Sequence, residues 1–319
     1  MSRGMYDPSL VQHEVCEEEE AETEPFSTVD RRLSAKKCIK NPGHPNFIPV
    51  KEFNPFHLPE DTRDEELFRL VMFLIHLTVK VTNKHISERR PEYCKGTDQK
   101  YPFADNRGQY ITICGTGTCR FVKMIYAPSK WCECQKCTTL HKRGKVVARI
   151  MIYTAKHVVY DKIEAQHSTV TFNYDDSTDA GVSFRVVDVE KTRVDSDFTC
   201  LIIDVCDVKM AEGIKKMRDE LYKLCQTVRK KYKDKGKKLT IIVSHPHGCS
   251  KHISVGEWLE RERHEGRMTN YSYTACTCPG SSGALVYTLG WRGWKSAHVH
   301  CGVIDLVNVS AKGGDEVND

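Results

Sequence analysis

The sequence lacks any apolar run long enough to cross a lipid bilayer. Its longest run, residues 70–77, contains His76 and is far shorter than the roughly 20 residues that a membrane helix needs. The first 25 residues also lack the basic start and the apolar stretch of roughly 7–15 residues that define a secretory signal. We therefore expect no membrane partner and a cytoplasmic or nuclear location.

The chain also lacks the even number of cysteines that complete disulfide pairing requires: its 319 residues include 15. Without a secretory signal, so many cysteines are typical of a protein in a reducing compartment, where disulfides are rare. An odd number further excludes complete internal pairing. We expect many of these thiols to be small buried side chains, and Cys200, Cys206 and Cys225 fit that role.

A strong net charge is absent too. The chain has 48 Lys and Arg against 43 Asp and Glu, a formal net charge of +5, which does not by itself indicate a nucleic-acid partner. The exception is local: residues 229–238, which begin with Arg229 and end with Lys238, hold seven Lys or Arg in ten positions. A solvated helix end explains this run, since cations complement the helix dipole there, and binding to nucleic acid is the alternative.

The two ends of the chain lack hydrophobic periodicity. Residues 1–60 begin with an acidic segment and continue with a segment rich in Pro and Asn, which predicts a disordered tail and a linker. Residues 309–319 are predicted to be a second, short tail.

Two helices are predicted between these ends. In residues 61–108, Thr62 and Glu65 have the spacing of a capping box, and a run of apolar residues at helical spacing follows, so this segment should pack on the core. A second helix, within residues 207–235, has apolar residues at intervals of three and four. Its apolar positions are Met210, Ile214, Met217, Leu221, Leu224 and Val228.

A Gly-Ser-Ser-Gly turn at residues 280–283 lies between two strand-like runs. Glycines on both sides of a serine allow successive backbone N–H groups to converge on one point, which is what an oxyanion needs. Such short motifs are more often ordinary turns. The turn therefore indicates a function only in combination with other stretches of the sequence.

Three other stretches accompany it. Residues 149–157 read R-I-M-I-Y-T-A-K-H, residues 195–204 read D-S-D-F-T-C-L-I-I-D, and residues 245–256 read H-P-H-G-C-S-K-H-I-S-V-G. Together with the serine turn, they resemble the corresponding stretches of intracellular trypsin-like peptidases, over about residues 110–308. The matching positions are His157, Asp197 and Ser282, which follow one another in the chymotrypsin order.

This resemblance implies an all-β core of two antiparallel β-barrels of the chymotrypsin type, with an N-terminal helix and a long inter-barrel helix. The peptidase domain would cover residues 109–308, with barrel one at about 109–206, the linking helix at about 207–235 and barrel two at about 239–308. The implied function is that of a serine endopeptidase acting on a protein or peptide, with no cofactor required for catalysis.

In this reading, His157 is the base, Asp197 orients it and Ser282 is the nucleophile. The N–H groups of Gly280 and Ser282 would form the oxyanion hole. Rivals remain for two of these roles: Asp188 and Asp195 for the aspartate, and Ser281 for the nucleophile. Ser281 stands where digestive members carry Asp, so activation by zymogen cleavage is not implied.

The stretch after the serine turn would line the substrate pocket. There His298 resembles the histidine with which viral cysteine relatives of the fold read a substrate side chain, which suggests Gln or Glu as the preferred residue. His300 is the neighbouring candidate, and either histidine could instead lie at the rim or bind zinc.

Residues 127–145 form an insertion that the resemblance does not require. Three thiols and an imidazole within it could hold a structural zinc ion; these ligands are Cys132, Cys134, Cys137 and His141. Cys114 and Cys119 are rival fourth ligands, and free thiols are the alternative to a zinc site.

Two other functions remain open. The chain could be an inactive peptidase-fold scaffold that binds peptides, although the complete triad argues against this. It could also be a nucleic-acid-associated protein stabilised by zinc. This alternative predicts that residues 229–238 and the insertion that contains Cys132 share one face.

Overall fold

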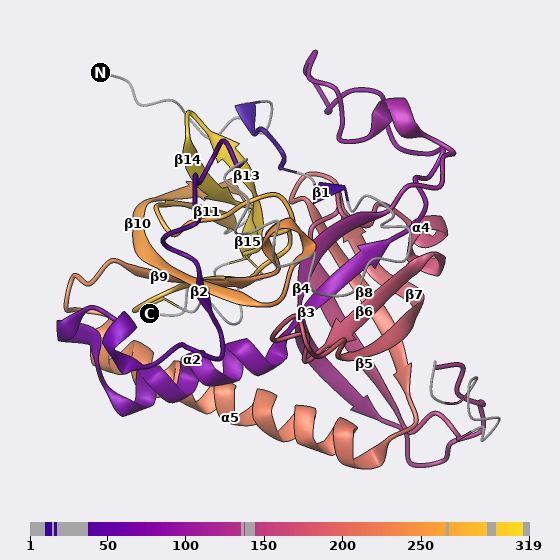
Figure 1. Ribbon diagram of the computed structural model, residues 1–319, viewed down its shortest axis with the longest axis horizontal. Coiled ribbons are helices and arrows are strands. Elements are labelled where there is room, and N and C mark those ends of the chain that lie inside the picture. The colour runs from indigo at the N-terminus through magenta and orange to yellow at the C-terminus, as the bar shows by residue number, and fades with distance from the viewer. Residues whose placement is uncertain are drawn as a thin grey trace.

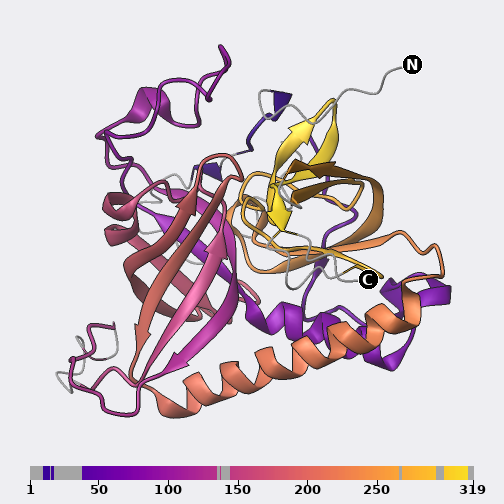
Figure 2. The ribbon, with the colours of Figure 1, turned by 180° about the vertical axis from the view of Figure 1, so that it is seen from behind.

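The computed structural model describes residues 10–14, 16–17, 38–134, 137, 144–265, 268–291 and 298–314. Two antiparallel β-sheets stand side by side, and two helices run along one side of the pair (Figures 1 and 2). The short strand β1 (Cys16–Glu17) lies between the two sheets in Figure 1.

The first sheet closes on itself. Its strands are β3 (Thr78–Asn83), β4 (Ile113–Met124), β5 (Ala148–Thr154), β6 (Ser168–Phe172), β7 (Val182–Arg193) and β8 (Phe198–Val205). Their order is β4-β3-β6-β7-β8-β5, and a further pairing of β4 with β5 completes a six-stranded barrel. Along β5, Ile150 and Ile152 are buried while Arg149 is exposed, because alternate side chains of a strand point to opposite faces.

The second sheet has the order β12-β9-β10-β11-β14-β13, with β2 and β15 at its margins. Its strands are β2 (Ile48–Pro49), β9 (Leu239–Ser244), β10 (His252–His264), β11 (Met268–Tyr273), β12 (Val286–Thr288), β13 (His300–Ile304), β14 (Val307–Ser310) and β15 (Gly313–Gly314). A bridge between Leu285 and Val299 joins the two ends of this order. The predicted all-β, two-barrel architecture is therefore confirmed.

Two long helices pack against each other beneath the sheets (Figure 2). They are α2 (Glu65–Leu77) and α5 (Val208–Tyr232), the predicted N-terminal and inter-barrel helices. The remaining helical turns are α4 (Lys162–Gln166), η2 (Pro55–His57), η3 (Glu60–Thr62), η4 (Ala104–Asn106) and η5 (Pro246–Gly248). None of the helices in the described ranges is long and apolar enough to span a membrane.

The predicted cap of α2 was wrong by two residues. Asp64, not Thr62, is the N-cap, and its carboxylate accepts a hydrogen bond from the Leu67 amide at 3.0 Å. The hydroxyl of Thr62 donates backwards to the Pro59 carbonyl at 2.9 Å, because Thr62 belongs to the preceding turn η3.

Parts of the predicted tail and linker pack against the rest of the fold. Phe53 and Leu58 are buried, and β2 pairs with β10. Val11 is only 1% exposed. The apolar residues of this segment have no regular spacing, because each contacts a different part of the fold, and sequence periodicity therefore could not reveal them.

Two segment boundaries also differ from expectation. The first barrel begins with β3, well before residue 109. Residues 309–314 extend β14 and form β15 instead of a tail.

Candidate active site

His157 and Asp197 lie in two adjacent turns at one end of the first barrel, after β5 and before β8. The Nδ1 atom of His157 is 2.7 Å from a carboxylate oxygen of Asp197, whose other oxygen accepts the His157 amide at 3.0 Å. Burial raises the pKa of Asp197, but His157 outweighs that effect and brings the pKa down to about 2. Asp197 is therefore ionised and holds the imidazole in one orientation.

The rival aspartates point elsewhere. Asp195 is exposed and lies 3.8 Å from Lys95, while Asp188 pairs with Lys162 at 2.9 Å. Of the three candidates, only Asp197 hydrogen-bonds to His157.

Ser282 lies in the turn between β11 and β12, and glycine is required beside it. Gly283 has a φ of +88°, and a Cβ there would be 2.2 Å from the Thr116 carbonyl oxygen. The rival Ser281 is part of the turn itself: its hydroxyl lies 3.0 Å from that of Ser244 and accepts a hydrogen bond from the Cys278 amide. Of the two serines, only Ser282 directs its hydroxyl to the main-chain carbonyl of Glu14.

The predicted oxyanion donors are available. Among the described residues, the amides of Gly280 and Ser282 have no hydrogen-bond acceptor. The carbonyl of Pro279 accepts the His247 amide at 2.5 Å. Because the N–H and C=O of a trans peptide point in opposite directions, this bond directs the Gly280 amide away from His247.

The chain's own N-terminal segment, residues 10–14, lies between β13 and the catalytic candidates, and we call the space that it fills the cleft. Gln12 exchanges two backbone hydrogen bonds with Val303, of 2.8 and 3.0 Å. The His13 ring lies 4.6 Å from the ring of His157, and burial together with His157 lowers the pKa of His13 to about 4. The Ser282 hydroxyl donates to the main-chain carbonyl of Glu14 at 2.6 Å. Sequence reasoning missed this segment, since nothing local relates it to the cleft.

The side chain of Glu14 enters a basic pocket. Lys40 donates to its carboxylate at 2.7 Å, and the Nε2 atom of His300 is 3.7 Å from it. Burial raises the pKa of Glu14, but His300 and Lys40 outweigh this effect and the pKa lies below its usual value. His298 is not in this pocket, because its Nε2 lies 2.9 Å from both the hydroxyl and the carbonyl of Thr269.

A buried ion pair supports the histidine turn, and sequence reasoning missed it. Arg90 and Glu164 are both fully buried and bond through two contacts, of 2.6 and 2.7 Å. Arg90 also donates to the main-chain carbonyl of His157 at 2.9 Å. The pair joins the loop that contains Arg90 and helix α4, which contains Glu164, to the turn that carries the His157 imidazole.

Four thiols cluster at the predicted zinc insertion. The sulfurs of Cys132, Cys134, Cys137 and Cys206 all lie within 4.8 Å of one another. His141 lies outside the described residues. Cys114 and Cys119 are instead buried in β4, away from the cluster. Cys206, expected to be a mere buried thiol, takes the fourth position because β8 ends beside the insertion.

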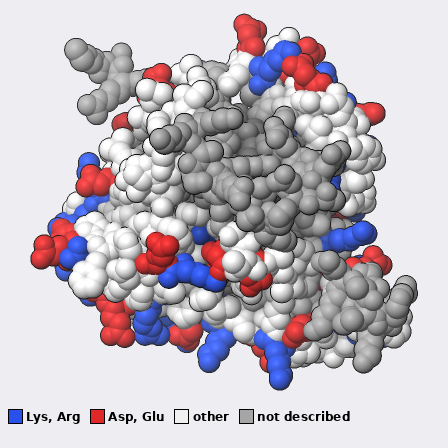
Figure 3. Space-filling model, viewed as in Figure 1, with Lys and Arg blue, Asp and Glu red and all other residues white. Residues whose placement is uncertain are grey.

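The basic run and the thiol cluster lie near opposite ends of α5. Cys206, a member of the cluster, immediately precedes α5, whereas residues 229–238 begin near its other end, about 35 Å away at 1.5 Å per residue. Two of the lysines pair with acids at the start of α2: Lys231 lies 3.3 Å from Asp64, and Lys237 contacts Asp61. On the face in Figure 3, basic and acidic side chains are interspersed.

No known family profile matches the chain, and no curated protein does. Among solved structures, a variant of the HtrA-type protease AlgW with a decapeptide is 11% identical over 76% of this chain, with a TM-score of 0.42. The chain spans 62% of the length of that structure. The active form of the Rv3671c protease from M. tuberculosis is 14% identical over 78% of this chain and 82% of its own, with a TM-score of 0.40. The chain has a chymotrypsin-like fold. The roles of its residues rest on its own geometry.

Proposed function

We propose that the protein is a serine endopeptidase that uses His157, Asp197 and Ser282. The observation that carries this proposal is that Ser282 and the His157–Asp197 pair contact adjacent residues of one extended segment. Ser282 hydrogen-bonds to the carbonyl of Glu14, and the ring next to that segment is that of His157, which is oriented by Asp197.

The chemistry follows from this arrangement. With Nδ1 bonded to Asp197, the His157 tautomer leaves Nε2 free to accept a proton, and Nε2 has no hydrogen-bond partner in the described parts of the chain. When the Ser282 hydroxyl turns from the carbonyl oxygen towards Nε2, it loses its proton to His157 as it attacks the carbonyl carbon. His157 then delivers the proton to the leaving amine.

The charge that develops on the carbonyl oxygen needs hydrogen-bond donors. The amides of Gly280 and Ser282, for which the described residues offer no backbone acceptor, would supply them, and one such donor is worth roughly 2.7–4 kcal/mol by mutational precedent. Together with the imidazole that Asp197 orients, they favour an enzyme over a scaffold.

A fluorophosphonate probe tests the assignment. The probe competes with residues 11–14 for the cleft, so a Gln12→Pro variant, which cannot donate its amide to Val303, is labelled alongside the wild type. We expect labelling at Ser282 in both proteins, faster in Gln12→Pro, and none in Ser282→Ala. Ser281→Ala is the matched control and should still react. Absence of labelling in Gln12→Pro would refute the proposal.

We also propose a structural zinc ion for the four-cysteine cluster. The sulfur of Cys206 lies 3.7 Å from that of Cys134 and 3.4 Å from that of Cys137, and four thiolates suit a closed tetrahedral zinc site. The Gly144 amide donates to the Cys137 sulfur at 3.4 Å, as expected for a sulfur that carries negative charge. Zinc would anchor the insertion to the end of β8 and has no part in the peptidase reaction. A cytoplasmic or nuclear location remains a prediction from the cysteine content.

A further inference from the structure

We propose that the protein cleaves its own chain after Glu14 and that its cleft selects acidic side chains on the amino side of the cut bond. This inference rests on the proposed peptidase function. It goes further by naming a substrate, the protein's own N-terminal segment, and the chemistry of the residue that the cleft recognises.

The N-terminal segment binds as a substrate strand would. Residues 10–14 run antiparallel to β13 through the Gln12–Val303 pair, and β1 then pairs with β4 of the other barrel. The segment thus crosses from one sheet to the other directly over the catalytic groups. This is strand addition, in which backbone hydrogen bonds give affinity and pockets for alternate side chains give specificity.

The opposing strand is shaped for this approach. A Cβ on Gly302 would lie 2.2 Å from the carbonyl oxygen of Gln12, so only glycine admits the segment at this distance. The side chain of Gln99 also donates to the carbonyl of Val11 at 2.8 Å. Hydrogen bonds to the backbone therefore hold the segment on either side of Gln12.

The pocket around Glu14 is built for a carboxylate. Lys40 is itself fixed by Thr277 and Asn308, each at 2.8 Å. His300 is fully buried, and its Nδ1 lies 2.6 Å from the Tyr273 hydroxyl. When Tyr273 donates to Nδ1, the ring proton is on Nε2, which faces the carboxylate of Glu14. A neutral or basic substrate side chain would leave the partly buried Lys40 without its carboxylate counter-ion.

The reaction balances with one water molecule. The oxygen of Ser282 bonds to the carbonyl carbon of Glu14, and the bond from that carbon to the nitrogen of Val15 breaks. The proton taken up by His157 passes to that nitrogen, which leaves as an amine. Water, deprotonated by His157, then attacks the ester and releases Ser282. The products are a peptide that ends in the Glu14 carboxylate and a chain that begins at Val15.

Intact-mass spectrometry of the full chain during incubation tests self-cleavage. We expect the wild type to lose the residues up to Glu14 at a rate unchanged by dilution, and Ser282→Ala to stay intact. Glu14→Ala should slow the cut by about 30-fold, the lower end of the effect of removing one partner of a hydrogen-bonded charge pair, because this pair is only partly buried. Glu52→Ala, which replaces an exposed glutamate outside the cleft, should cleave as the wild type does.

A peptide library, offered to the Gln12→Pro variant, tests the selectivity. Cuts after Glu or Asp are expected, with loss of this preference in Lys40→Ala. If the fluorophosphonate labels Ser282 but the chain stays intact, self-cleavage is wrong while the peptidase stands. Cuts after basic or aromatic residues would overturn the acidic preference, and a rate that rises with protein concentration would overturn cleavage within one chain.

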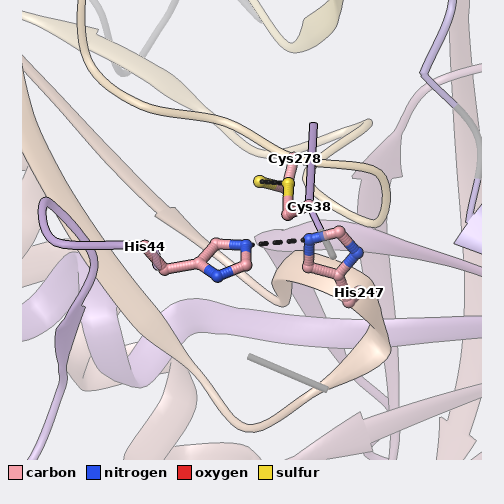
Figure 4. Close-up of side chains that lie close together, drawn as sticks. All are labelled: Cys38, His44, His247 and Cys278. Carbon is pink, nitrogen blue, oxygen red and sulfur yellow. Dashed lines mark hydrogen bonds between the residues drawn. The ribbon is translucent and has the colours of Figure 1, made fainter. Parts of the chain in front are cut away.

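A second observation, independent of the first, concerns a cluster of two thiols and two imidazoles. Cys38, His44, His247 and Cys278 contribute one ligand atom each, all within 4.8 Å of one another. Figure 4 shows the two imidazoles facing each other beside the two sulfurs. We infer that this cluster binds a zinc ion.

The distances match tetrahedral zinc. Zinc bond lengths place two thiolates about 3.8 Å and two imidazole nitrogens about 3.3 Å apart. The sulfurs of Cys38 and Cys278 are 3.6 Å apart, and the Nε2 atoms of His44 and His247 are 3.1 Å apart. A disulfide would need about 2.05 Å between the sulfurs. The Asn41 amide and side chain donate to the two sulfurs at 3.4 and 3.1 Å, which suits charged thiolates.

Such an ion would support both halves of the active site. Cys38 and His44 bracket Lys40, the cation of the substrate pocket. Cys278 and His247 flank the peptide between Pro279 and Gly280, which orients one oxyanion donor. The metal would therefore tie residues 38–44 to the nucleophile turn.

Metal analysis of the purified chain tests this site. We expect about two zinc ions per chain, one in each cluster, and the loss of about one in each of Cys278→Ser, His44→Gln and Cys206→Ser. Cys276→Ser, in the same loop as Cys278, is the matched control and should keep both. The cobalt-loaded His44→Gln protein should lose the visible absorption of a mixed thiolate and imidazole site. Unchanged zinc content and cobalt spectrum in His44→Gln would overturn the inference.

Discussion

Replacing Arg90 with alanine should destabilise this protein far more than a surface substitution would. The guanidinium makes two hydrogen bonds to Glu164, and neither side chain is exposed at all. It also donates to the carbonyls of Pro102 and His157, at 3.0 and 2.9 Å. Without Arg90, the carboxylate of Glu164 would be a buried charge without its counter-ion.

The magnitude follows from that loss. Removing one partner of a buried ion pair typically lowers the free energy of unfolding by about 3–5 kcal/mol, and we expect a loss in that range here. For a chain of this size, each kcal/mol shifts the melting temperature by roughly 2–4 °C, so we expect Arg90→Ala to melt about 6–20 °C lower. Activity should also fall, because the turn that carries His157 loses a hydrogen bond.

Thermal unfolding measured by circular dichroism provides the assay. Lys100→Ala, which breaks the exposed pair with Asp105, is the control and should melt as the wild type does. The double variant Arg90→Met/Glu164→Leu should lose less stability than the sum of its single variants. A melting temperature of Arg90→Ala within about 2 °C of wild type would show that the pair does not hold this turn in place.

Three other predictions concern a cap, a turn and a titration. Asp64→Ala should lower the free energy of unfolding in urea by about 1 kcal/mol or more, and by more than Thr62→Ala does, since Asp64 is the true N-cap of α2; equal effects would contradict this. Gly283→Ala should abolish fluorophosphonate labelling and lower the melting temperature, because of its φ of +88° and the 2.2 Å approach to Thr116; normal labelling would refute the requirement for glycine. The pKa of Asp197 falls from 3.8 to about 2 on folding, so its contribution to stability is present above about pH 4 and is lost as the pH falls towards 2. Across that range the wild type should lose about 2 kcal/mol more than Asp197→Asn, and parallel losses would contradict the assignment.

The catalytic candidates could be identified because the stretches that carry the resemblance to trypsin-like peptidases are short and local. Ser282 needs glycine beside it, and His157 follows a run that is strongly β-forming. The two helices were likewise evident from apolar spacing, although the cap of α2 was misplaced because Thr62 and Asp64 are both good capping residues.

Other features depend on contacts between distant parts of the chain. Cys206 joins the thiols of the insertion only because β8 ends beside them, and Lys40 meets Glu14 only because residues 38–44 fold against the nucleophile turn. Arg90 gives no sequence signal, because an arginine is usually exposed.

The amino-acid sequence by itself determined the two helices, which follow from short-range apolar spacing, and its resemblance to trypsin-like peptidases indicated the β-rich core and the three candidate catalytic side chains. Only the tertiary structure decided what lies in the cleft, which histidine faces it and which side chains gather into metal-binding sets. Those outcomes depend on packing that brings together residues more than 200 positions apart, such as Glu14 and Ser282, and no local pattern encodes such proximity.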